Sequence, residues 1–231
     1  MRSVRQLVLI LSAALALGSC AAGSAQSGGA PSTSSSAVTT SGAAPSGGTT
    51  TCSYPADGAA AKPVDPPAAA EPSTGTSTAT MTLPGGNVTI ALDRGATPCT
   101  VGSFVHLAQA GYFDGTRCHR LTTGDLAVLQ CGDPTGTGSG GPGYSFADET
   151  TPSMTYPAGT VAMANAGPDT NGSQFFLVYA NSQLPPNYTV FGSITAGLDV
   201  LTKIAAAGVQ GGGSDGPPAM PVTISKVAIA G

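Results

Sequence analysis

The feature that most limits what this chain can fold into is an abrupt change of composition near residue 76. Residues 20–75 are rich in Gly, Ser, Thr, Pro and Ala and contain almost no large apolar side chains. Such a segment cannot bury enough apolar surface to offset the conformational entropy lost on folding. We therefore expect a disordered, flexible tether over 20–75 and one folded domain over 76–231.

The first residues are typical of an export signal. Arg2 and Arg5 precede an apolar run that is too short to span a bilayer comfortably. The run ends in Leu-Gly-Ser-Cys at residues 17–20, which resembles a bacterial lipobox, where the cysteine is acylated and becomes the mature N-terminus. An ordinary cleaved signal with an incidental cysteine is the alternative. We predict a signal peptide over 1–19 and lipidation of Cys20, which would anchor the protein at the extracytoplasmic face of the cell membrane.

The charged and metal-binding residue types exclude several classes of function. The net charge is −4, and the 8 Lys and Arg residues are too few and too scattered to bind nucleic acid. His106 and His119 are the only histidines, and no HExxH or paired CxxC motif occurs. The glycine-rich run at 136–141 lacks the Lys-Ser/Thr of a phosphate-binding loop. The sequence therefore predicts no metal site and no cofactor.

Short strands dominate the predicted domain. Val88, Ile90 and Leu92 alternate with polar neighbours, as in a strand with one buried face. The predicted strands are 79–83, 87–92, 117–121, 127–131, 159–164, 174–179, 189–194 and 221–229.

Two helices complete the predicted architecture. Thr97 and Pro98 provide a helix cap and a first helical residue, and Gly111 ends that helix. A second helix is predicted over 196–207. Many short strands with glycine-rich turns indicate a mainly β fold, either a barrel or a sandwich. We expect a closed eight-stranded antiparallel β-barrel capped by the two α-helices.

Two motifs in this domain are specific enough to identify a family. The first is Cys118-His119-Arg120-Leu121, followed by Gln130-Cys131-Gly132-Asp133, and the second runs from Met163-Ala164-Asn165-Ala166 to Gln174-Phe175-Phe176. Together they resemble the cyclophilin family of peptidyl-prolyl cis–trans isomerases, and the stretches 143–149 and 190–192 match as well. The resemblance covers about residues 78–231, and it implies a barrel with two capping helices that isomerises X–Pro bonds.

The resemblance also implies roles for individual residues. Arg120 would donate a hydrogen bond to the proline nitrogen while the bond rotates, and Gln130 would hold Arg120 in place. The implied substrate-binding residues are Leu126, Met163, Ala164, Asn165, Ala166, Gln174, Phe176, Leu184 and Tyr188. Met163, Phe176 and Leu184 would form the proline pocket, although each could instead be a plain core residue.

The chain departs from the family pattern around this pocket. The segment after Arg120 is two residues longer than usual, so Leu126 replaces the family's phenylalanine unless Ala127 does. Gln183 stands where many members have tryptophan, and Tyr188 stands where they have a histidine. We therefore expect looser burial of the proline ring.

Four cysteines remain once Cys20 is lipidated. An even number in an exported chain suggests two disulfides. Cys118 and Cys131 lie on the two strands of a predicted hairpin, so a bond between them is reasonable. That would leave Cys52 with Cys99, a bond that pins the end of the tether to the domain. Four reduced thiols are the alternative.

The sequence thus supports two hypotheses of different kinds. The first is an isomerase that assists the folding of exported, proline-containing polypeptides. The second is a non-catalytic module on the cell surface that binds proline peptides or acts as a chaperone. In either case, a compact domain on a long tether suggests a monomer.

Overall fold

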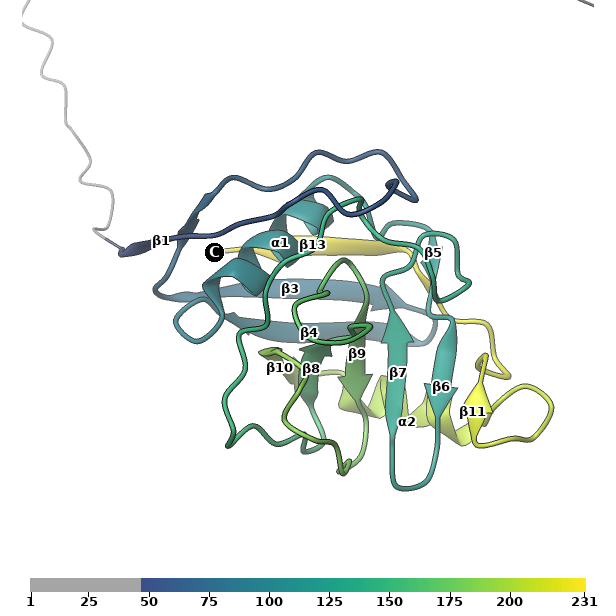
Figure 1. Ribbon diagram of the computed structural model, residues 1–231. Coiled ribbons are helices and arrows are strands. Elements are labelled where there is room, and N and C mark those ends of the chain that lie inside the picture. The colour runs from purple at the N-terminus through teal and green to yellow at the C-terminus, as the bar shows by residue number, and fades with distance from the viewer. Residues whose placement is uncertain (1–46) are drawn as a thin grey trace, which may run out of the picture. The chain divides into compact units, whose positions relative to one another are not determined.

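The computed structural model describes residues 47–231 (Figure 1). The predicted signal peptide, Cys20 and the first part of the predicted tether lie outside the described residues. Over residues 47–231, none of the helices has the length and apolar character needed to cross a membrane.

Nine antiparallel strands form the main sheet. They are β3 (Thr76–Leu83), β4 (Gly86–Asp93), β6 (Arg120–Thr122), β7 (Val128–Cys131), β8 (Thr160–Met163), β9 (Phe175–Val178), β10 (Val190–Ala196), β11 (Asp215–Gly216) and β13 (Lys226–Ala230). Their spatial order is β11-β6-β7-β9-β8-β10-β4-β3-β13. Every strand predicted from the sequence is present, although two of them are each divided into two short pieces.

The sheet does not close into the barrel that the sequence led us to expect. Its edge strands, β11 and β13, are not paired with each other. Instead, β5 (Thr116–Arg117) pairs with β12 (Thr223–Ile224) in a separate ladder, and these strands precede β6 and β13 along the chain. Because β5 leads into β6 and β12 leads into β13, this short ladder connects the two ends of the sheet without closing it. The mainly β architecture with two helices is confirmed, whereas a closed ring of eight strands is absent from the described residues.

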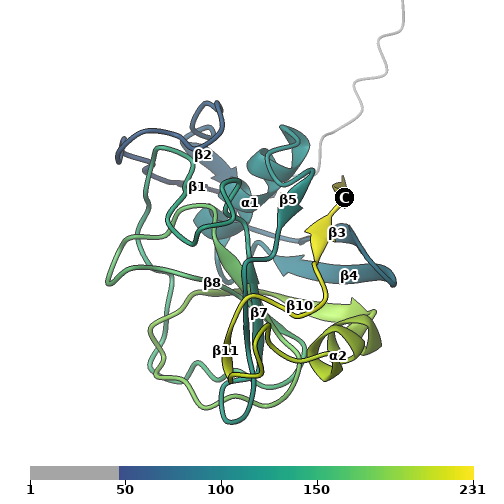
Figure 2. The same cartoon turned by 90° about the vertical axis from the view of Figure 1, so that its right-hand side faces the viewer.

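Most of the buried apolar side chains belong to one core cluster. Val88, Ile90 and Leu92 of β4 are fully buried, as their alternation predicts. The helices α1 (Pro98–Gln109) and α2 (Leu198–Ala206) add side chains to this core from opposite sides (Figures 1 and 2). Phe104 of α1 contacts three other rings of the core at centroid distances of 5.1, 5.3 and 5.1 Å.

The cap of α1 differs from the one predicted. The Thr97 side chain makes no capping hydrogen bond, because its hydroxyl donates to the carbonyl oxygen of Asp93. The carboxylate of Glu149 accepts from the backbone N–H groups of Cys99 and Thr100 at 3.1 and 2.8 Å. A negative charge at this position also interacts favourably with the helix dipole. Glu149 thus ties the segment before β8 to α1.

Part of the predicted tether belongs to the folded domain. Strands β1 (Thr49–Thr51) and β2 (Ala70–Pro72) pair with each other and contact α1. Between them, residues 52–62 form a segment that we call the strap (dark blue in Figure 1). The boundary expected at residue 75 is therefore wrong for residues 47–75. Composition misplaced it because few large apolar side chains hold this segment: the Tyr54 ring packs against Tyr144 and Phe146, and a disulfide and backbone hydrogen bonds supply the other contacts.

Both predicted disulfides are present. Cys52 of the strap is bonded to Cys99 of α1, and Cys118 is bonded to Cys131 across the hairpin that carries Arg120. The first bond fixes one end of the strap to the helix. The second lies beside the strand pair that forms the candidate site.

Candidate active site

Arg120 and Gln130 occupy facing positions on β6 and β7. They are direct partners in the antiparallel ladder, so their side chains leave the sheet on the same face. Arg120 Nη1 donates to Gln130 Oε1 at 3.2 Å. The structure therefore brings together the two residues predicted to carry the chemistry, and Gln130 restrains the guanidinium as expected.

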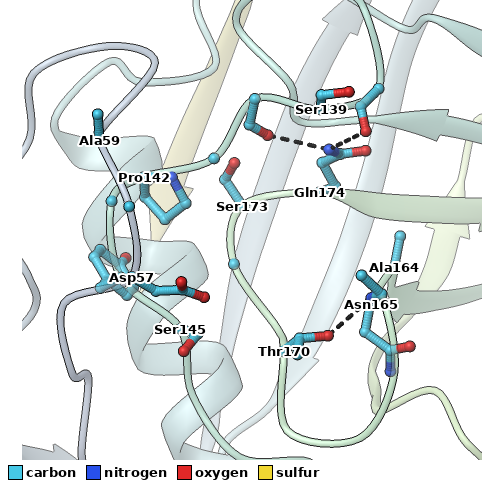
Figure 3. A pocket seen from close by; sticks show the side chains of 18 of the residues that line it. Asp57, Ala59, Ser139, Pro142, Ser145, Ala164, Asn165, Thr170, Ser173 and Gln174 are labelled. Atoms are coloured by element: carbon cyan, nitrogen blue, oxygen red, sulfur yellow. Dashed lines mark hydrogen bonds between the residues drawn. The ribbon is translucent and has the colours of Figure 1, made fainter.

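Gln130 is in turn held by a second glutamine. Its Nε2 donates to Oε1 of Gln174 at 2.9 Å. Gln174 Nε2 then donates to the carbonyl oxygens of Gly138 and Gly140 at 2.9 and 3.1 Å (Figure 3). The side-chain amide of Gln174 thereby fixes that of Gln130. This series of hydrogen bonds connects Arg120 to the loop over residues 133–140.

A buried carboxylate organises that loop. Asp133 is fully buried and accepts backbone hydrogen bonds from Thr135, Thr137, Gly138 and Ser139. Burial alone would raise the pKa of Asp133, but the hydrogen bonds from Thr135 and the loop backbone together lower it to about 2. The glycine-rich run that the sequence presents as a turn is thus a support for Gln174.

We expect the Asp133 carboxylate to contribute to acid stability. Because its pKa is lower in the folded protein than in the unfolded chain, its contribution is present above about pH 4 and is lost as the pH falls towards 2. Asp133→Asn should destabilise the protein by about 1–3 kcal/mol at pH 7, since the loop N–H groups lose a charged acceptor. Urea unfolding at pH 7 and pH 3 measures both effects. A variant as stable as the wild type at pH 7 would contradict this role.

Asp215 is a site residue that the sequence analysis missed. Its carboxylate accepts from Arg120 Nε at 2.8 Å and from Nη2 at 2.7 Å, a bidentate ion pair. Asp215 lies on β11, the edge strand beside β6. The hydrogen bond from Arg120 lowers the pKa of Asp215. Arg120 is thus held from two sides, by Asp215 and by Gln130.

We expect Asp215→Asn to lower kcat about three- to tenfold and to change KM little. The pair is partly exposed, so its strength is modest, but the bidentate geometry fixes the guanidinium plane. Asp215→Glu keeps the charge and should restore part of the loss. Exchange spectroscopy of cis and trans X–Pro peptides measures both constants. An unchanged kcat in Asp215→Asn would show that Gln130 suffices.

A small pocket lies directly beside Arg120. Its volume is about 170 Å³, and its lining residues are Arg120, Leu126, Val128, Gln130, Ala164, Asn165, Phe176, Leu184 and Tyr188. Eight of these were predicted from the sequence, including Leu126 in place of the family's phenylalanine. Val128 was not, although it shares a strand face with Gln130. The Phe176 and Tyr188 rings meet edge to face at 5.6 Å and stiffen the wall.

Met163 does not belong to this pocket. It is buried in the main core together with Phe175, its ladder partner. Side chains alternate along a strand, so Ala162 and Ala164 face the other way, with Phe176. The expectation that Met163 forms the pocket floor is therefore wrong, and Val128 and Phe176 take that place.

A larger pocket adjoins the small one. Its volume is about 640 Å³, and Ala166 and Gln174 line it, together with the loop at 138–145 and residues 57–59 of the strap (Figure 3). The two pockets share Gln130, Ala164 and Asn165. Ala166 and Gln174 were predicted to bind substrate, and the structure places them here rather than beside Arg120.

Neither pocket contains a recognisable metal site. Within the described part of the chain, no group of three or more His, Cys, Asp or Glu side chains is placed to hold a metal ion. His119, next to Arg120 in the sequence, lines neither pocket, and burial lowers its pKa. What the site presents is a fixed guanidinium that can donate hydrogen bonds beside a pocket with apolar walls of Leu126, Phe176 and Leu184.

Sequence comparison gives a consistent result. The profile of the family described as cyclophilin type peptidyl-prolyl cis-trans isomerase/CLD matches residues 77–229. The probable peptidyl-prolyl cis-trans isomerase B of Mycobacterium tuberculosis is 53% identical over 193 residues, covering 76% of this chain and 63% of that protein. Its Mycobacterium leprae counterpart is 52% identical, with 76% and 65% covered. The chain thus spans less than two thirds of the length of these relatives.

Structural comparison agrees with the sequence match. A cyclophilin type peptidyl-prolyl cis-trans isomerase of Cryptosporidium parvum superposes with a TM-score of 0.60 at 29% identity, covering 68% of this chain and 99% of that one. The same protein solved in the presence of the dipeptide Ala-Pro gives a TM-score of 0.59 at 29% identity, with 67% and 99% covered. The chain belongs to the cyclophilin-type peptidyl-prolyl cis-trans isomerase family.

Proposed function

We propose that this protein catalyses cis–trans isomerisation of X–Pro bonds in other polypeptides. The observation that carries the proposal is the position of Arg120, a restrained guanidinium that lines a small pocket beside apolar side chains such as Phe176 and Leu184. We expect the pocket to accept the proline ring, which would bring the ring nitrogen next to the guanidinium. Relatives named as peptidyl-prolyl isomerases support the same reaction.

The geometry suits a reaction whose barrier is electronic. Amide resonance sets the rotational barrier at about 18–20 kcal/mol, and uncatalysed X–Pro exchange takes about 10–100 s. When the bond is twisted, the nitrogen loses conjugation and gains a lone pair that can accept a hydrogen bond. A donor fixed at that position binds the twisted state better than either planar state, which lowers the barrier.

Arg120 retains donors for this task. A guanidinium has five N–H donors. Asp215 accepts from Nε and Nη2, and Gln130 accepts from Nη1, so one hydrogen on each terminal nitrogen is left for the substrate. Because the side chain is held from two sides, little conformational entropy is lost when the substrate binds. No bond is broken, and neither a nucleophile nor a proton transfer is required.

Turnover and simple binding are distinguished by measuring both on the same peptides. Exchange spectroscopy gives the isomerisation rate, and chemical-shift titration gives the affinity. The proposal expects faster exchange with the wild type and loss of that acceleration when Arg120 is replaced. Binding without any acceleration would support the non-catalytic module instead.

We also propose that the protein acts outside the cytoplasm on exported polypeptides, anchored by acylated Cys20. Two observations support this: Arg2 and Arg5 precede an apolar run, and that run ends in Leu-Gly-Ser-Cys at residues 17–20. Two disulfides are typical of an oxidising compartment and support it independently. Labelling cells with radioactive palmitate tests the anchor. The wild type should take up label in the membrane fraction, and Cys20→Ala should not.

A further inference from the structure

We infer that Asp57 of the strap gives the larger pocket a preference for substrates with a Lys or Arg side chain close to the proline. This inference rests on the proposed function and adds a substrate class to it. The strap lies outside residues 77–229, the part of the chain that matches the family profile. Any selectivity that it provides is therefore an addition to the shared domain.

The strap forms one wall of the larger pocket. It runs antiparallel to residues 141–145 and is joined to them by three backbone hydrogen bonds. The N–H of Ser145 donates to the carbonyl oxygen of Pro55 at 3.0 Å. The N–H groups of Asp57 and Ala61 donate to the carbonyl oxygens of Gly143 and Gly141 at 2.9 and 2.8 Å. Asp57, Gly58 and Ala59 consequently line the pocket. Figure 3 shows the Asp57 carboxylate directed into the space between Ser145 and Ser173.

This wall is fixed at both ends. On one side, Cys52 is bonded to Cys99, and the Tyr54 hydroxyl donates to the Cys99 carbonyl at 2.8 Å. On the other side, Lys62 Nζ donates to the carbonyl oxygens of Gly111 and Tyr112. Asp57 therefore sits on an anchored segment, and its charge is positioned before a substrate arrives.

The charge of the pocket favours a cation. Asp57 is the only acidic or basic side chain that lines it within residues 47–231. The other polar groups include the hydroxyls of Ser139 and Ser145, which can accept hydrogen bonds from an ammonium or guanidinium group. The volume of about 640 Å³ is sufficient for a long side chain. A carboxylate in the same position would be repelled.

A bound peptide would reach this pocket from the catalytic one. Gln130, Ala164 and Asn165 line both, so the two cavities are neighbours along one groove. An extended chain advances about 3.3 Å per residue, and alternate side chains point the same way. A residue one to three positions from the proline would therefore place its side chain near Asp57.

The test uses proline peptides that carry Lys, Gln or Glu at each of three positions on either side of the proline. Exchange spectroscopy with the purified full chain gives kcat/KM for each peptide. At one position we expect Lys to exceed Glu by about three- to tenfold, and the ratio to decrease with added salt. Asp57→Asn should bring this ratio close to one, and Asp57→Lys should reverse it.

The matched control is Asp65→Asn. Asp65 is an exposed acidic residue close to the strap that lines neither pocket, so this variant should keep the wild-type ratio. A Lys-to-Glu ratio of one at every position in the wild type, or an unchanged ratio in Asp57→Asn, would overturn the inference. Peptide affinities provide the same ratio without turnover. Absence of acceleration with a preserved affinity ratio would therefore refute only the catalytic proposal.

Discussion

Arg120→Ala is expected to reduce kcat/KM for proline peptides by about 10²–10³-fold, the usual effect of removing one preorganised donor from a transition state. The reduction should be mainly in kcat. The apolar lining of the small pocket stays intact, so ground-state binding of the proline ring should change little. Exchange spectroscopy under saturating and subsaturating peptide separates the two constants.

Arg120→Lys is the matched variant for this prediction. It keeps the charge but cannot hold Asp215 bidentately while donating to Gln130 and to the substrate. We expect it to recover less than a tenth of the wild-type kcat. The Arg120 side chain is partly exposed, so neither variant should change the unfolding midpoint strongly. A folded Arg120→Ala protein with wild-type kcat would refute the mechanism.

The parts of the site that could be predicted are those that local sequence determines. The two short motifs that resemble the family pointed to Arg120 and Gln130, and the ladder between β6 and β7 places them opposite each other. The alternation of Val88, Ile90 and Leu92 identified a strand because one face of β4 is more exposed than the other. In both cases the pattern depends on neighbours in sequence.

Met163 shows where such patterns fail. All four residues of β8 are buried, and so are all four of β9. One face packs into the core and the other forms the floor of the pocket, so apolar character does not tell the two faces apart. The motif alone suggested the wrong face for Met163, and only the ladder between β8 and β9 resolves it.

Asp215 and the strap were missed for a different reason. Asp215 is 95 residues from Arg120 in the sequence, and it follows a glycine-rich loop without alternation. The strap contains few large apolar residues, so composition indicated a tether. Its attachment depends on a disulfide, on backbone hydrogen bonds and on the single ring of Tyr54, none of which composition reveals.

The bond between Cys52 and Cys99 is expected to be the largest single stabilising element of the strap. The two cysteines are 47 residues apart, and the chain-entropy relation gives about 4 kcal/mol for closing a loop of that length. This is a large fraction of the 5–15 kcal/mol typical of a folded domain. We therefore expect Cys52→Ala with Cys99→Ala to lower the unfolding free energy and to release the strap.

Hydrogen exchange separates these two consequences. The N–H groups of Asp57 and Ala61 donate to backbone carbonyls of the loop at 141–143, so their exchange reports whether the strap is docked. In the double variant the N–H groups of Asp57 and Ala61 should exchange faster. The N–H groups of β4 should keep the same ranking of exchange rates among themselves as in the wild type. The matched control, Cys118→Ala with Cys131→Ala, removes the other bond and should leave Asp57 and Ala61 protected. If the Cys52–Cys99 double variant kept both the unfolding free energy and the protection of Asp57, hydrogen bonds, Lys62 and the packing of the Tyr54 ring would suffice to hold the strap.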